Sequence, residues 1–458
     1  GRDHGFRTQT ESTTGFEEYR ACVMEWTLER AESVTGVPAP AIQEIARAYA
    51  RADRAILCWT LGITEHHNAV DNVLSLINLA LLTGHVGRYG SGLNPLRGQN
   101  NVQGGGDMGA IPNKLPGFQD IEKDAAARAR FEAAWGVPII PKYGKNLTQM
   151  FESMEAGALR ALYVIGEIPA SSEADMNRAA HLLATRDMLI VQDIFMTKTA
   201  EMAHVVLPAS VAAFESDGTV TNSERRVQRV RKALDPPGEA KDDIWILCEL
   251  ARRLGASWGE VTPASAWEEL RTLSPMHGGM SWARLEAHGG LQWPCPDENH
   301  PGSKFLHGRL WEKDPAKQGP KAPFSAVVDD PPVDRLTDEF PLRLTTGRKL
   351  DSYNTGVQTR AFASPLRDGE AIEVSPEEAR RLGLHDNERV RVVSRRGSVE
   401  AKVRVDPGLR SGLVFMTFHF PEEVETNRLT IDATDLKSGT AEFKAAAVRI
   451  EKLSAAPA

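Results

Sequence analysis

GLNPLRGQNNVQGGGDMG, residues 92–109, is the stretch around which the rest of this chain is organised. Its six glycines allow a backbone that turns sharply and comes close to a ligand. Arg97 is its one cation, and the planar guanidinium matches a carboxylate. The stretch predicts a loop that places a small anion beside a large polar cofactor, and an apolar helix before it makes the alternative of a disordered linker weaker. Its amide side chains both donate and accept hydrogen bonds: Asn94, Gln99, Asn100, Asn101 and Gln103.

Length and composition describe an ordinary globular protein. The chain has 458 residues, of which 41% are hydrophobic and 25% charged, and a chain of this length forms about three domains. No stretch approaches the roughly 18 consecutive apolar residues of a membrane helix, so we expect no membrane span. The formal net charge of −8 disfavours a nucleic acid as the main partner.

The cysteines lie far apart and never form a C-x-x-C pair, so local spacing supplies neither an iron–sulfur nor a zinc site. They are Cys22, Cys58, Cys248 and Cys295. Their pattern is typical of reduced thiols, and we expect a cytoplasmic protein. The sequence starts at Gly1 without Met or a signal-type segment, and its first residues resemble the interior of a longer chain. We therefore expect that an amino-terminal part is missing.

The first part of the chain alternates helices and strands. Helical periodicity runs through residues 15–50 with a break at residues 35–38, and residues 55–59 then predict a short buried strand. Residues 71–82 predict an almost wholly apolar helix that ends at Gly84. A strand–loop–helix unit presents ligands at the carboxyl edge of a parallel sheet, so its loop is a candidate cofactor contact.

His66 and His67 lie in this loop and raise the question of a metal site. Adjacent histidines point apart in most backbone conformations, and no third ligand follows at a useful spacing. We therefore expect no metal ligation there.

A second α/β run predicts a parallel sheet. Its strands are residues 162–165, 188–192 and 204–207, and its helices are residues 173–184 and 197–202. Polar residues stand at the strand ends, where a nucleotide is usually held: Glu167, Gln192, Asp193 and Thr197. Neither G-x-G-x-x-G nor G-x-x-x-x-G-K-[ST] occurs within this run, and a purely structural role for these polar residues stays open.

Residues 218–232, GTVTNSERRVQRVRK, form a basic stretch for which a solvated strand face and a phosphate contact are equally consistent. Its cations are Arg225, Arg226, Arg229, Arg231 and Lys232. Residues 242–254 predict an amphipathic helix. Residues 256–335 are rich in Pro, Gly, His and Trp and predict a wrapping connection with little regular structure.

Short β runs dominate after Asp334 and predict a separate β-barrel domain. The runs are residues 342–345, 371–374, 389–393, 399–405, 413–418 and 446–450, with one helix at residues 376–382. Two stretches between them, TTGRKLDSYNTG and NRLTID, are polar enough to face a ligand.

Several motifs in a fixed order resemble one known family. They are NPLRGQNNVQG, IGEIP, VQDIFMT, VVLPA, TNSERRVQ, TTGR and GTAEFKAAAVRI, and they extend over nearly the whole chain. In this order they look like the catalytic subunit of molybdenum- or tungsten-dependent formate dehydrogenase, within the larger group that binds two molybdopterin guanine dinucleotides. The resemblance implies an α/β fold with parallel-sheet, Rossmann-like pterin-binding domains, followed by a β-barrel of the double-psi type. We expect an α/β pterin domain over residues 1–97, a guanine-dinucleotide domain over residues 98–334 and the barrel over residues 335–458.

The resemblance also implies roles for individual residues. Arg97 matches the arginine that fixes the formate carboxylate near the metal, and its neighbours along the pterin match Gly98 and Gln99. The strand-end loop that holds one cofactor matches Leu61, Gly62 and Glu65, although the family often has Gln at the last position. Positions around a guanine nucleotide match Gly166, Gln192, Asp193, Thr197 and Asp243. Barrel positions that close over the pterins match Gly347, Arg348, Tyr353, Asn427 and Lys444.

The chain departs from the family pattern in its metal ligand, which is a cysteine or selenocysteine followed directly by histidine. None of the four cysteines is followed by histidine. The resemblance therefore implies roughly the carboxyl-terminal half of the subunit, with the ligand segment and an iron–sulfur cluster in the missing amino-terminal part. GGGDMG also replaces the usual GACDMG.

The implied activity is the reversible oxidation of formate to carbon dioxide, with Arg97 orienting the substrate by a charge-assisted pair. Electrons would pass to iron–sulfur centres and then to iron–sulfur or flavin subunits linked to NAD or ferredoxin. Two alternatives stay open. One is a non-catalytic pterin-fold subunit with a structural or electron-transfer role, and the other is a different oxidoreductase of the same group, such as nitrate reductase.

Overall fold

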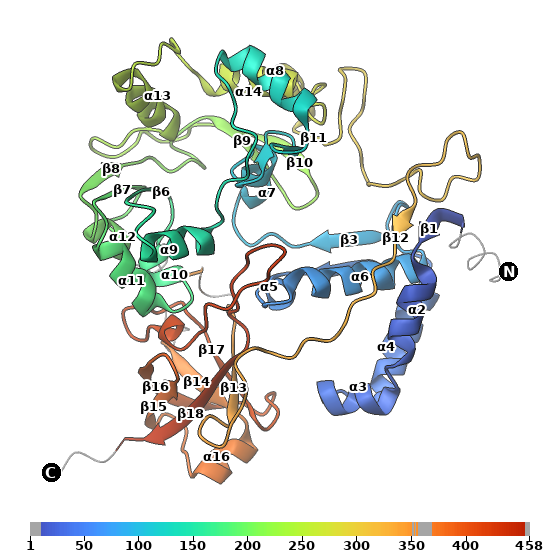
Figure 1. The fold of residues 1–458 in the computed structure, drawn as a ribbon, viewed down its shortest axis with the longest axis vertical. Helices are drawn as coiled ribbons and strands as arrows, with labels where there is room; N and C mark the ends of the chain where they lie inside the picture. The colour runs from blue at the N-terminus through green and yellow to red at the C-terminus, as the bar shows by residue number, and fades with distance from the viewer. Residues whose placement is uncertain (1–10, 350–351, 353, 356–368, 454–458) are drawn as a thin grey trace.

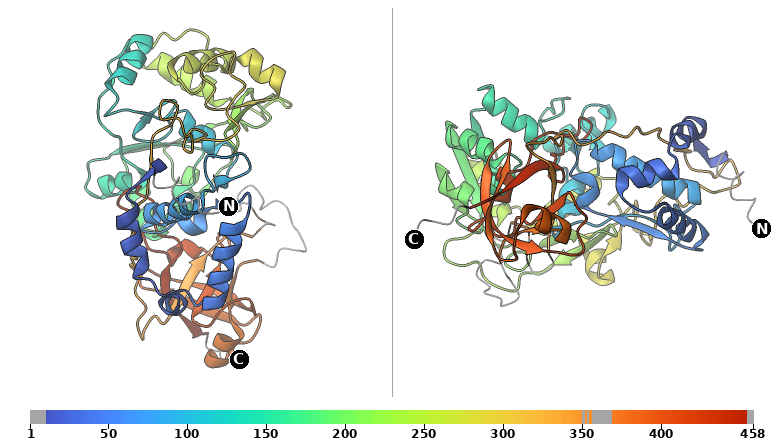
Figure 2. Two further views of the ribbon diagram at one scale, coloured as in Figure 1. Left: turned by 90° about the vertical axis from the view of Figure 1, so that its right-hand side faces the viewer. Right: turned by 90° about the horizontal axis from the view of Figure 1, so that it is seen from below.

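A computed structural model gives the fold of residues 11–349, 352, 354–355 and 369–453. Figure 1 shows a β-barrel at one end of the molecule, an α/β layer next to it and a helical region at the opposite end. The first helices form an arm, which Figure 2 shows to one side of the barrel.

The arm is helical, as the sequence predicts. It consists of α2 (Phe16–Met24), α3 (Leu28–Thr35) and α4 (Ala39–Arg51). Phe16 and Tyr19 pack against the ring of Phe324, with ring centroids 5.4 and 4.9 Å away. Next to them, β1 (Thr13–Thr14) pairs in parallel with β12 (Ala322–Pro323). The connection before the barrel therefore returns to the start of the described chain.

The sheet that precedes the Arg97 loop has two strands in the described part of the chain, β2 (Ile56–Trp59) and β3 (Gly92–Pro95), which run parallel. α5 (Leu61–Thr64) and α6 (Ala69–Thr83) connect them, and Gly84 closes α6 in the left-handed conformation, as predicted. The prediction of a buried strand is wrong, because Ile56 is 56% exposed. The described chain does not cover both faces of this two-stranded sheet. No helix among the described residues is long and apolar enough to cross a membrane.

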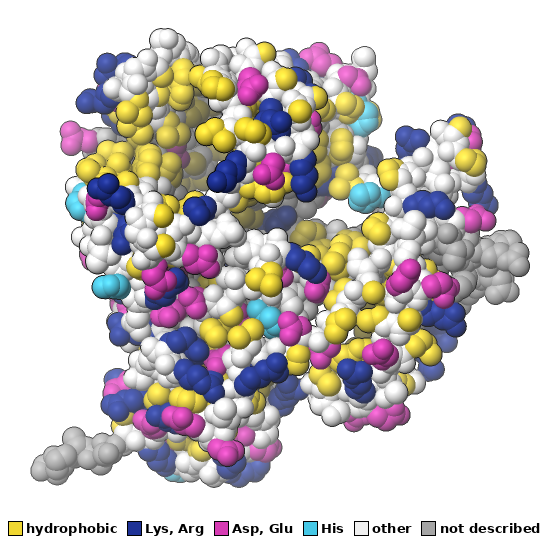
Figure 3. Space-filling view, viewed as in Figure 1, with side chains coloured by type: hydrophobic (Ala, Val, Ile, Leu, Met, Phe, Trp, Pro, Cys, Tyr) yellow, Lys and Arg dark blue, Asp and Glu magenta, His cyan; other side chains and the backbone are white. Residues whose placement is uncertain are grey.

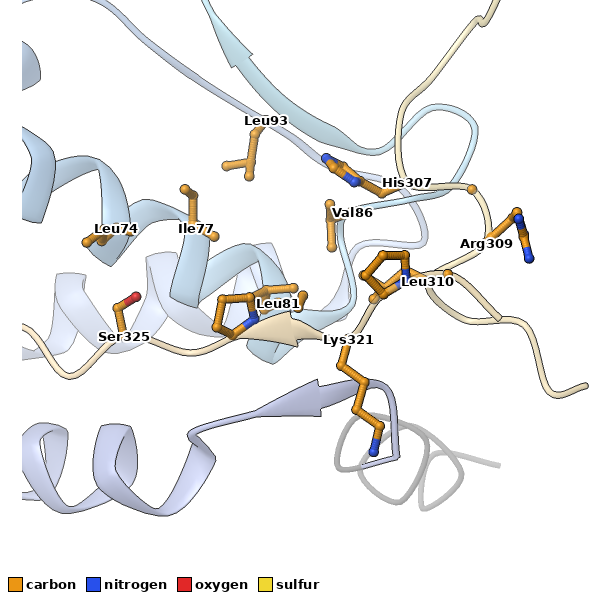
Figure 4. Close-up of a pocket in the computed structure, with 15 residues that line it drawn as sticks. Leu74, Ile77, Leu81, Val86, Leu93, His307, Arg309, Leu310, Lys321 and Ser325 are labelled. Atoms are coloured by element: carbon orange, nitrogen blue, oxygen red, sulfur yellow. The ribbon is translucent and has the colours of Figure 1, made fainter. Parts of the chain in front are cut away.

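An apolar cavity of about 640 Å³ opens between α6, β3 and the connection before the barrel. Figure 4 shows Leu74, Ile77 and Leu81 of α6 on one side of it and Leu93 and His307 on the other. The apolar sequence of α6 therefore exceeds what the described chain buries.

The second sheet is parallel, as predicted, with β6 (Ala161–Ile165) and β8 (Val205–Pro208) on either side of β7 (Met188–Asp193). Its helices are α9 (Leu147–Glu155), α10 (Pro169–Ser172), α11 (Met176–Ala184) and α12 (Lys198–Glu201). α11 starts later than predicted because Asp175 caps it by accepting from the N–H of Arg178. Glu173 is thereby left outside the helix.

The expectation of little regular structure in residues 256–335 is wrong for the first half of that stretch. α14 (Pro263–Leu273) begins with a capping box of Thr262 and Ser265, and α15 (Trp282–His288) is capped by Ser281. Both helices pack into one core with the antiparallel sheet of β9 (Gly218–Thr221), β10 (Arg226–Val230) and β11 (Leu291–Gln292). Around them lie α8 (Ala125–Trp135), α13 (Asp243–Arg253) and the hairpin of β4 (Lys114–Leu115) and β5 (Gln119–Asp120).

The barrel closes in the order β13-β17-β14-β16-β15-β18. Its strands are β13 (Leu342–Thr346), β14 (Ala371–Val374), β15 (Arg389–Ser394), β16 (Ser398–Val405), β17 (Leu413–Met416) and β18 (Ala446–Lys452). α16 (Pro376–Leu382) has the predicted bounds, and a short 3₁₀ helix spans Thr426–Arg428. Alternate residues of the strands, such as Val390 and Val392, are fully buried inside the barrel. The predicted α/β fold with a carboxyl-terminal barrel is therefore confirmed.

Candidate functional site

The Arg97 loop leaves the end of β3 and enters α7 (Val102–Asp107). It is fastened to the β9–β10 hairpin at two points. The backbone N–H of Arg97 donates to Ser223 Oγ at 3.1 Å, and the N–H of Thr221 donates to Asn101 Oδ1 at 2.9 Å. Asn101 has a φ of 64°, a left-handed conformation that Asn tolerates well. The TNSERRVQ motif thus supports the loop, a role that neither prediction for that stretch included.

The side chain of Arg97 is held by one of its three nitrogens. Its Nε donates to Gln103 Oε1 at 3.0 Å. Among the described residues, neither terminal nitrogen has a hydrogen-bond or ion-pair partner, and the residue is exposed. Gln99, two positions later, lines a cavity. The fork of Arg97 therefore remains available to an anion.

The basic stretch that follows β9 is engaged with the protein itself. The guanidinium of Arg225 donates to the carbonyls of Trp293 and Ser303. Arg229 lies 3.4 Å from the ring centroid of Trp282. The remaining cations form ion pairs: Arg226 with Glu224, Arg231 with Glu286 and Lys232 with Asp235. These contacts favour the structural interpretation of the stretch over the phosphate contact.

A cavity of about 190 Å³, which we call the interdomain cavity, lies between the loop after β2, the end of β6 and the barrel. Four of its lining residues are predicted cofactor contacts from four separate segments: Glu65, Gln99, Arg348 and Asn427. Asn427 donates through Nδ2 to the carbonyls of Ser171 and Ser172 at 3.1 and 3.3 Å, while its buried Oδ1 has no hydrogen-bond partner in the described chain. The cavity therefore contains an unused acceptor.

Glu167 and Glu173 also line the interdomain cavity, and neither has an ion-pair partner within the described ranges. Burial, followed by the charge of Glu167, raises the pKa of Glu173 to about 7. Burial and then the charge of Asp193 raise the pKa of Glu167. Both shifts mean that hydrogen-bond donors are scarce around these carboxylates.

A second cavity of about 220 Å³, which we call the strand-end cavity, adjoins the first at the end of β6. It is lined by four of the residues predicted around a guanine nucleotide: Gly166, Gln192, Asp193 and Asp243. Gln192 is fully buried and donates to Asp243 Oδ1 at 2.5 Å. Burial raises the pKa of both Asp193 and Asp243. Ser210, on the same lining, has a buried hydroxyl without a hydrogen-bond partner among the described residues.

Glu65 and Lys444 form an ion pair behind the interdomain cavity, with Oε2 and Nζ 3.0 Å apart. Their side chains are 14% and 5% exposed, so the pair is nearly removed from water. Lys444 also donates to the carbonyl of Thr346 at 2.9 Å. The negative charge of Glu65 is therefore balanced within the chain.

His66 and His67 do not point apart, and that expectation is wrong. Both Nδ1 atoms lie 3.2 Å from the carboxylate of Glu442, whose side chain is fully buried. His67 also contacts Asp330 through Nε2 at 3.1 Å. We call His66, His67 and Glu442 the histidine clasp, because it joins the loop before α6 to the barrel. Among the described residues, no three His, Cys, Asp or Glu side chains gather so that they could hold a metal ion.

The other predicted residues within the described chain do not line these two cavities. Thr197 caps α12 by accepting from the N–H of Ala200, and Gly347 lies against Phe415 of the barrel. Leu61 and Gly62 start α5, and Gly98 follows Arg97. Tyr353 lies outside the described residues.

The residues present fit a pterin dinucleotide cofactor. A side-chain carbon added at Gly62, Gly98 or Gly166 would meet no atom within 4 Å, so the backbone is open to close approach by a ligand at all three positions. Apart from that of Glu65, the carboxylates of the two cavities have no ion-pair partner among the described residues, and they suit the N–H donors of guanine and pterin rings. Figure 3 shows a further hollow near α13 with hydrophobic side chains around it, where a cavity of about 640 Å³ lies between α13 and the end of β8.

Two functional candidates carried no signal that could be used in the sequence. Glu173 falls within the helix predicted for residues 173–184. The sequence pattern does not reveal that the helix begins only after its cap, Asp175. Glu442 lies 375 positions from His67, and a contact so distant along the chain cannot be inferred from one sequence.

Two family models match the chain. Residues 25–253 match the model of molybdopterin oxidoreductases, and residues 342–447 match that of the molydopterin dinucleotide binding domain.

Curated relatives extend over nearly the whole chain. It is 43% identical to the alpha subunit of F420-dependent formate dehydrogenase 2 from Methanococcus maripaludis, over 96% of this chain and 64% of the relative. It is 36% identical to formate dehydrogenase H from Escherichia coli, over 96% of this chain and 62% of the relative. The chain thus spans somewhat less than two thirds of the length of these relatives.

Among solved structures, acetylene hydratase from Pelobacter acetylenicus has a similar fold, with a TM-score of 0.69 and 18% identity over 96% of this chain and 67% of that one. The fold, the two cavities and the family models agree, and this chain belongs to the molybdopterin oxidoreductase family.

Proposed function

We propose that the chain is part of the catalytic subunit of a formate dehydrogenase, in which Arg97 binds the formate carboxylate beside a molybdenum or tungsten centre held by two molybdopterin guanine dinucleotides. The identity to formate dehydrogenase subunits supports this proposal. The proposal includes electron transfer to iron–sulfur centres and to partner subunits. It also includes the division of the chain after residues 97 and 334.

The observation that carries the proposal is the way Arg97 is held. Its Nε is engaged by Gln103, so the guanidinium is fixed on one edge. Its two terminal nitrogens are free of protein partners among the described residues and form the fork that binds a carboxylate bidentately. A loop fastened to the β9–β10 hairpin presents this fork. Arg225 differs, because its terminal nitrogens donate to the backbone carbonyls of Trp293 and Ser303.

Formate oxidation breaks one C–H bond and yields carbon dioxide, one proton and two electrons. A bound molybdenum or tungsten centre would supply the two-electron redox chemistry. The contribution of Arg97 is orientation, since a carboxylate held through both oxygens directs its C–H bond straight away from the guanidinium. The same fork would orient carbon dioxide in the reverse reaction.

The two cavities provide the cofactor contacts. In the strand-end cavity, Asp193 and Asp243 would accept from the N1–H and amino group of guanine, with Gly166 allowing close approach. In the interdomain cavity, Gln99 and Asn427 would bond the polar edge of a pterin.

The test is Arg97→Ala in the enzyme purified with every chain that accompanies it. Formate oxidation should fall by at least about a thousandfold, because a lost bidentate charge pair removes both affinity and orientation. Metal and pterin content should remain at the wild-type level. Arg97→Lys should also oxidise formate slowly, since an ammonium cannot form two parallel hydrogen bonds to a carboxylate.

Arg20→Ala is the matched control, because Arg20 is exposed on α2 and pairs with Glu17 at the surface. It should leave turnover unchanged. Retained formate oxidation in Arg97→Ala would refute the assignment of Arg97. Wild-type protein that carries metal and pterin yet reduces nitrate and ignores formate would refute the proposed substrate.

A further inference from the structure

A run of hydrogen bonds leads from Arg97 into the interior of the protein. Arg97 Nε donates to Gln103 Oε1 at 3.0 Å, and Gln103 Nε2 donates to Asp107 Oδ1 at 2.9 Å. The second carboxylate oxygen of Asp107 accepts from Trp293 Nε1 at 2.9 Å. In each of these contacts one group is the donor and the other the acceptor, and the run ends on the carboxylate of Asp107.

This carboxylate is placed where an acid is costly. Asp107 is fully buried and Gln103 is 8% exposed. The two residues lie four positions apart in α7, and therefore on one face of the helix. No cation contacts Asp107 directly among the described residues, so its charge faces Arg97 across an amide. A buried acid without a direct cation costs stability, and such groups are concentrated at functional sites.

We infer that Gln103 and Asp107 are positioning residues for Arg97: the ionised Asp107 fixes which end of the Gln103 amide faces the guanidinium. This inference rests on the proposed function and adds to it how the substrate-binding fork is aimed. Nε is engaged in this way, and both terminal nitrogens are left for the carboxylate.

The direction of the amide decides the outcome. An ionised carboxylate only accepts hydrogen bonds, so it must face the NH₂ end of Gln103. The carbonyl end then faces Arg97 and accepts from Nε. A protonated Asp107 can donate to the carbonyl end, which allows the amide to turn and brings its NH₂ against the N–H of Arg97. Two donors repel, so the guanidinium loses its fixed orientation.

The surroundings of Asp107 determine when this change occurs. Burial raises the pKa of Asp107, and hydrogen bonds from Gln103, Trp293 and Thr221 and the charge of Arg97 oppose the rise. Thr221 faces it from β9 and Trp293 from the segment after β11, and neither side chain titrates. Since orientation needs the ionised acid, formate turnover should fall on the acidic side as Asp107 becomes protonated.

The experiment measures kcat and KM for formate against pH in the holoenzyme. Asp107→Asn cannot accept from both Gln103 and Trp293, because one end of its amide is a donor. We expect kcat/KM to fall by roughly tenfold or more, the equivalent of one misdirected hydrogen bond to a charged group, mainly through a higher KM. The fall of turnover on the acidic side of the pH profile, which we call the acidic limb and assign to Asp107, should disappear. Asp235→Asn, on the surface and 93% exposed, is the matched control and should keep the wild-type profile.

Trp293→Phe is a second variant that keeps an aromatic ring in the core and removes one hydrogen bond from the ionised form of Asp107. The acidic limb should move to higher pH, because a carboxylate with fewer donors is a weaker acid. A purely structural role for Trp293 would lower the stability of the protein without moving this limb.

The possible results separate the two proposals. Wild-type holoenzyme that fails to oxidise formate overturns the proposed function. Active wild type with an unchanged KM and pH profile in Asp107→Asn overturns the positioning role. If Asp107→Asn does not fold, the pH profile of Trp293→Phe decides between the outcomes. An acidic limb at the same pH as in the wild type would overturn the positioning role.

Discussion

The two walls of the interdomain cavity differ in how their charges are balanced. On the wall formed by the loop before α6 and the barrel, Glu65 has a cationic partner within the chain, and Glu442, next to the lining residue Phe443, has two protonatable ones. On the wall formed at the end of β6, Glu167 and Glu173 have no such partner among the described residues. The carboxylates of the first wall are balanced within the chain, whereas those of the second remain available to the donors of a ligand.

This difference leads to opposite expectations for substitutions. On the balanced wall, removing one charge leaves its partner buried and unpaired, so the protein should lose stability. On the acidic wall, removing a charge relieves an unfavourable burial, so the protein without cofactor should gain stability.

The largest effect is expected for Lys444→Met, which strands the carboxylate of Glu65 behind the cavity. We expect a loss of about 3–5 kcal/mol in the free energy of unfolding, measured by denaturant titration. Lys437→Met breaks the more exposed pair with Asp71 and should cost less than about 1 kcal/mol. The double variant Lys444→Met/Glu65→Gln should recover most of the loss. If Lys444→Met is no less stable than Lys437→Met, the balanced wall is not held together by this pair.

A gain in stability is expected for Glu173→Gln in protein without cofactor. The pKa of Glu173 is raised to about 7, so its ionisation destabilises the folded state increasingly from about pH 4.5 upward and fully above pH 7. Glu173→Gln should therefore stabilise the protein by about 1–3 kcal/mol at pH 8 and have little effect at pH 4.5. Thermal unfolding at the two pH values measures this. Glu155→Gln is the control, because Arg178 holds the pKa of Glu155 below its usual value. If Glu173→Gln changes the stability relative to wild type by the same amount at both pH values, the charge of Glu173 is not a source of instability in the acidic wall.

The smallest effect concerns the histidine clasp. Burial works to lower the pKa of His66, but hydrogen bonding and the charge of Glu442 outweigh it and the pKa is raised. Burial works to raise the pKa of Glu442, but hydrogen bonds and charge from His66 hold it lower. The stabilisation is therefore present between about pH 4.5 and 6.5. It is lost as pH rises through the raised pKa of His66, or falls through the lowered pKa of Glu442.

His66→Gln should cost about 1 kcal/mol at pH 6 and much less at pH 9, as thermal unfolding midpoints of the two proteins would show. An equal cost at both pH values would mean that the clasp acts by shape and not by charge.

The same two regions show what a single sequence can predict. The barrel strands follow from alternation, and α16 follows from its Ser375 cap, its first-turn Pro376 and its closing Gly383. The Pro, Gly and Trp content of residues 256–335 predicts irregular structure, and it outweighs the signal of the Thr262 and Ser265 cap that starts α14. Ile56 lies exposed since its sheet has two strands in the described chain, which the pattern of one strand does not reveal.

For the site, local position was enough for the strand-end cavity, because parallel strands bring Gly166 and Asp193 to one edge. The contacts that balance the charges of the other wall cannot be predicted from the sequence. Lys444 meets Glu65, and Glu442 meets both histidines, across the whole length of the chain. No periodicity or spacing connects residues that only the tertiary fold brings together.

We propose that the acceptors at the end of the β6–β8 sheet bind a guanine base. Acid release of nucleotide from the purified protein, followed by chromatographic identification of the base, tests it most directly. We expect GMP from the wild type and a reduced GMP yield from Asp243→Asn. Release of CMP or AMP in its place, or no nucleotide from protein that contains pterin, would contradict it.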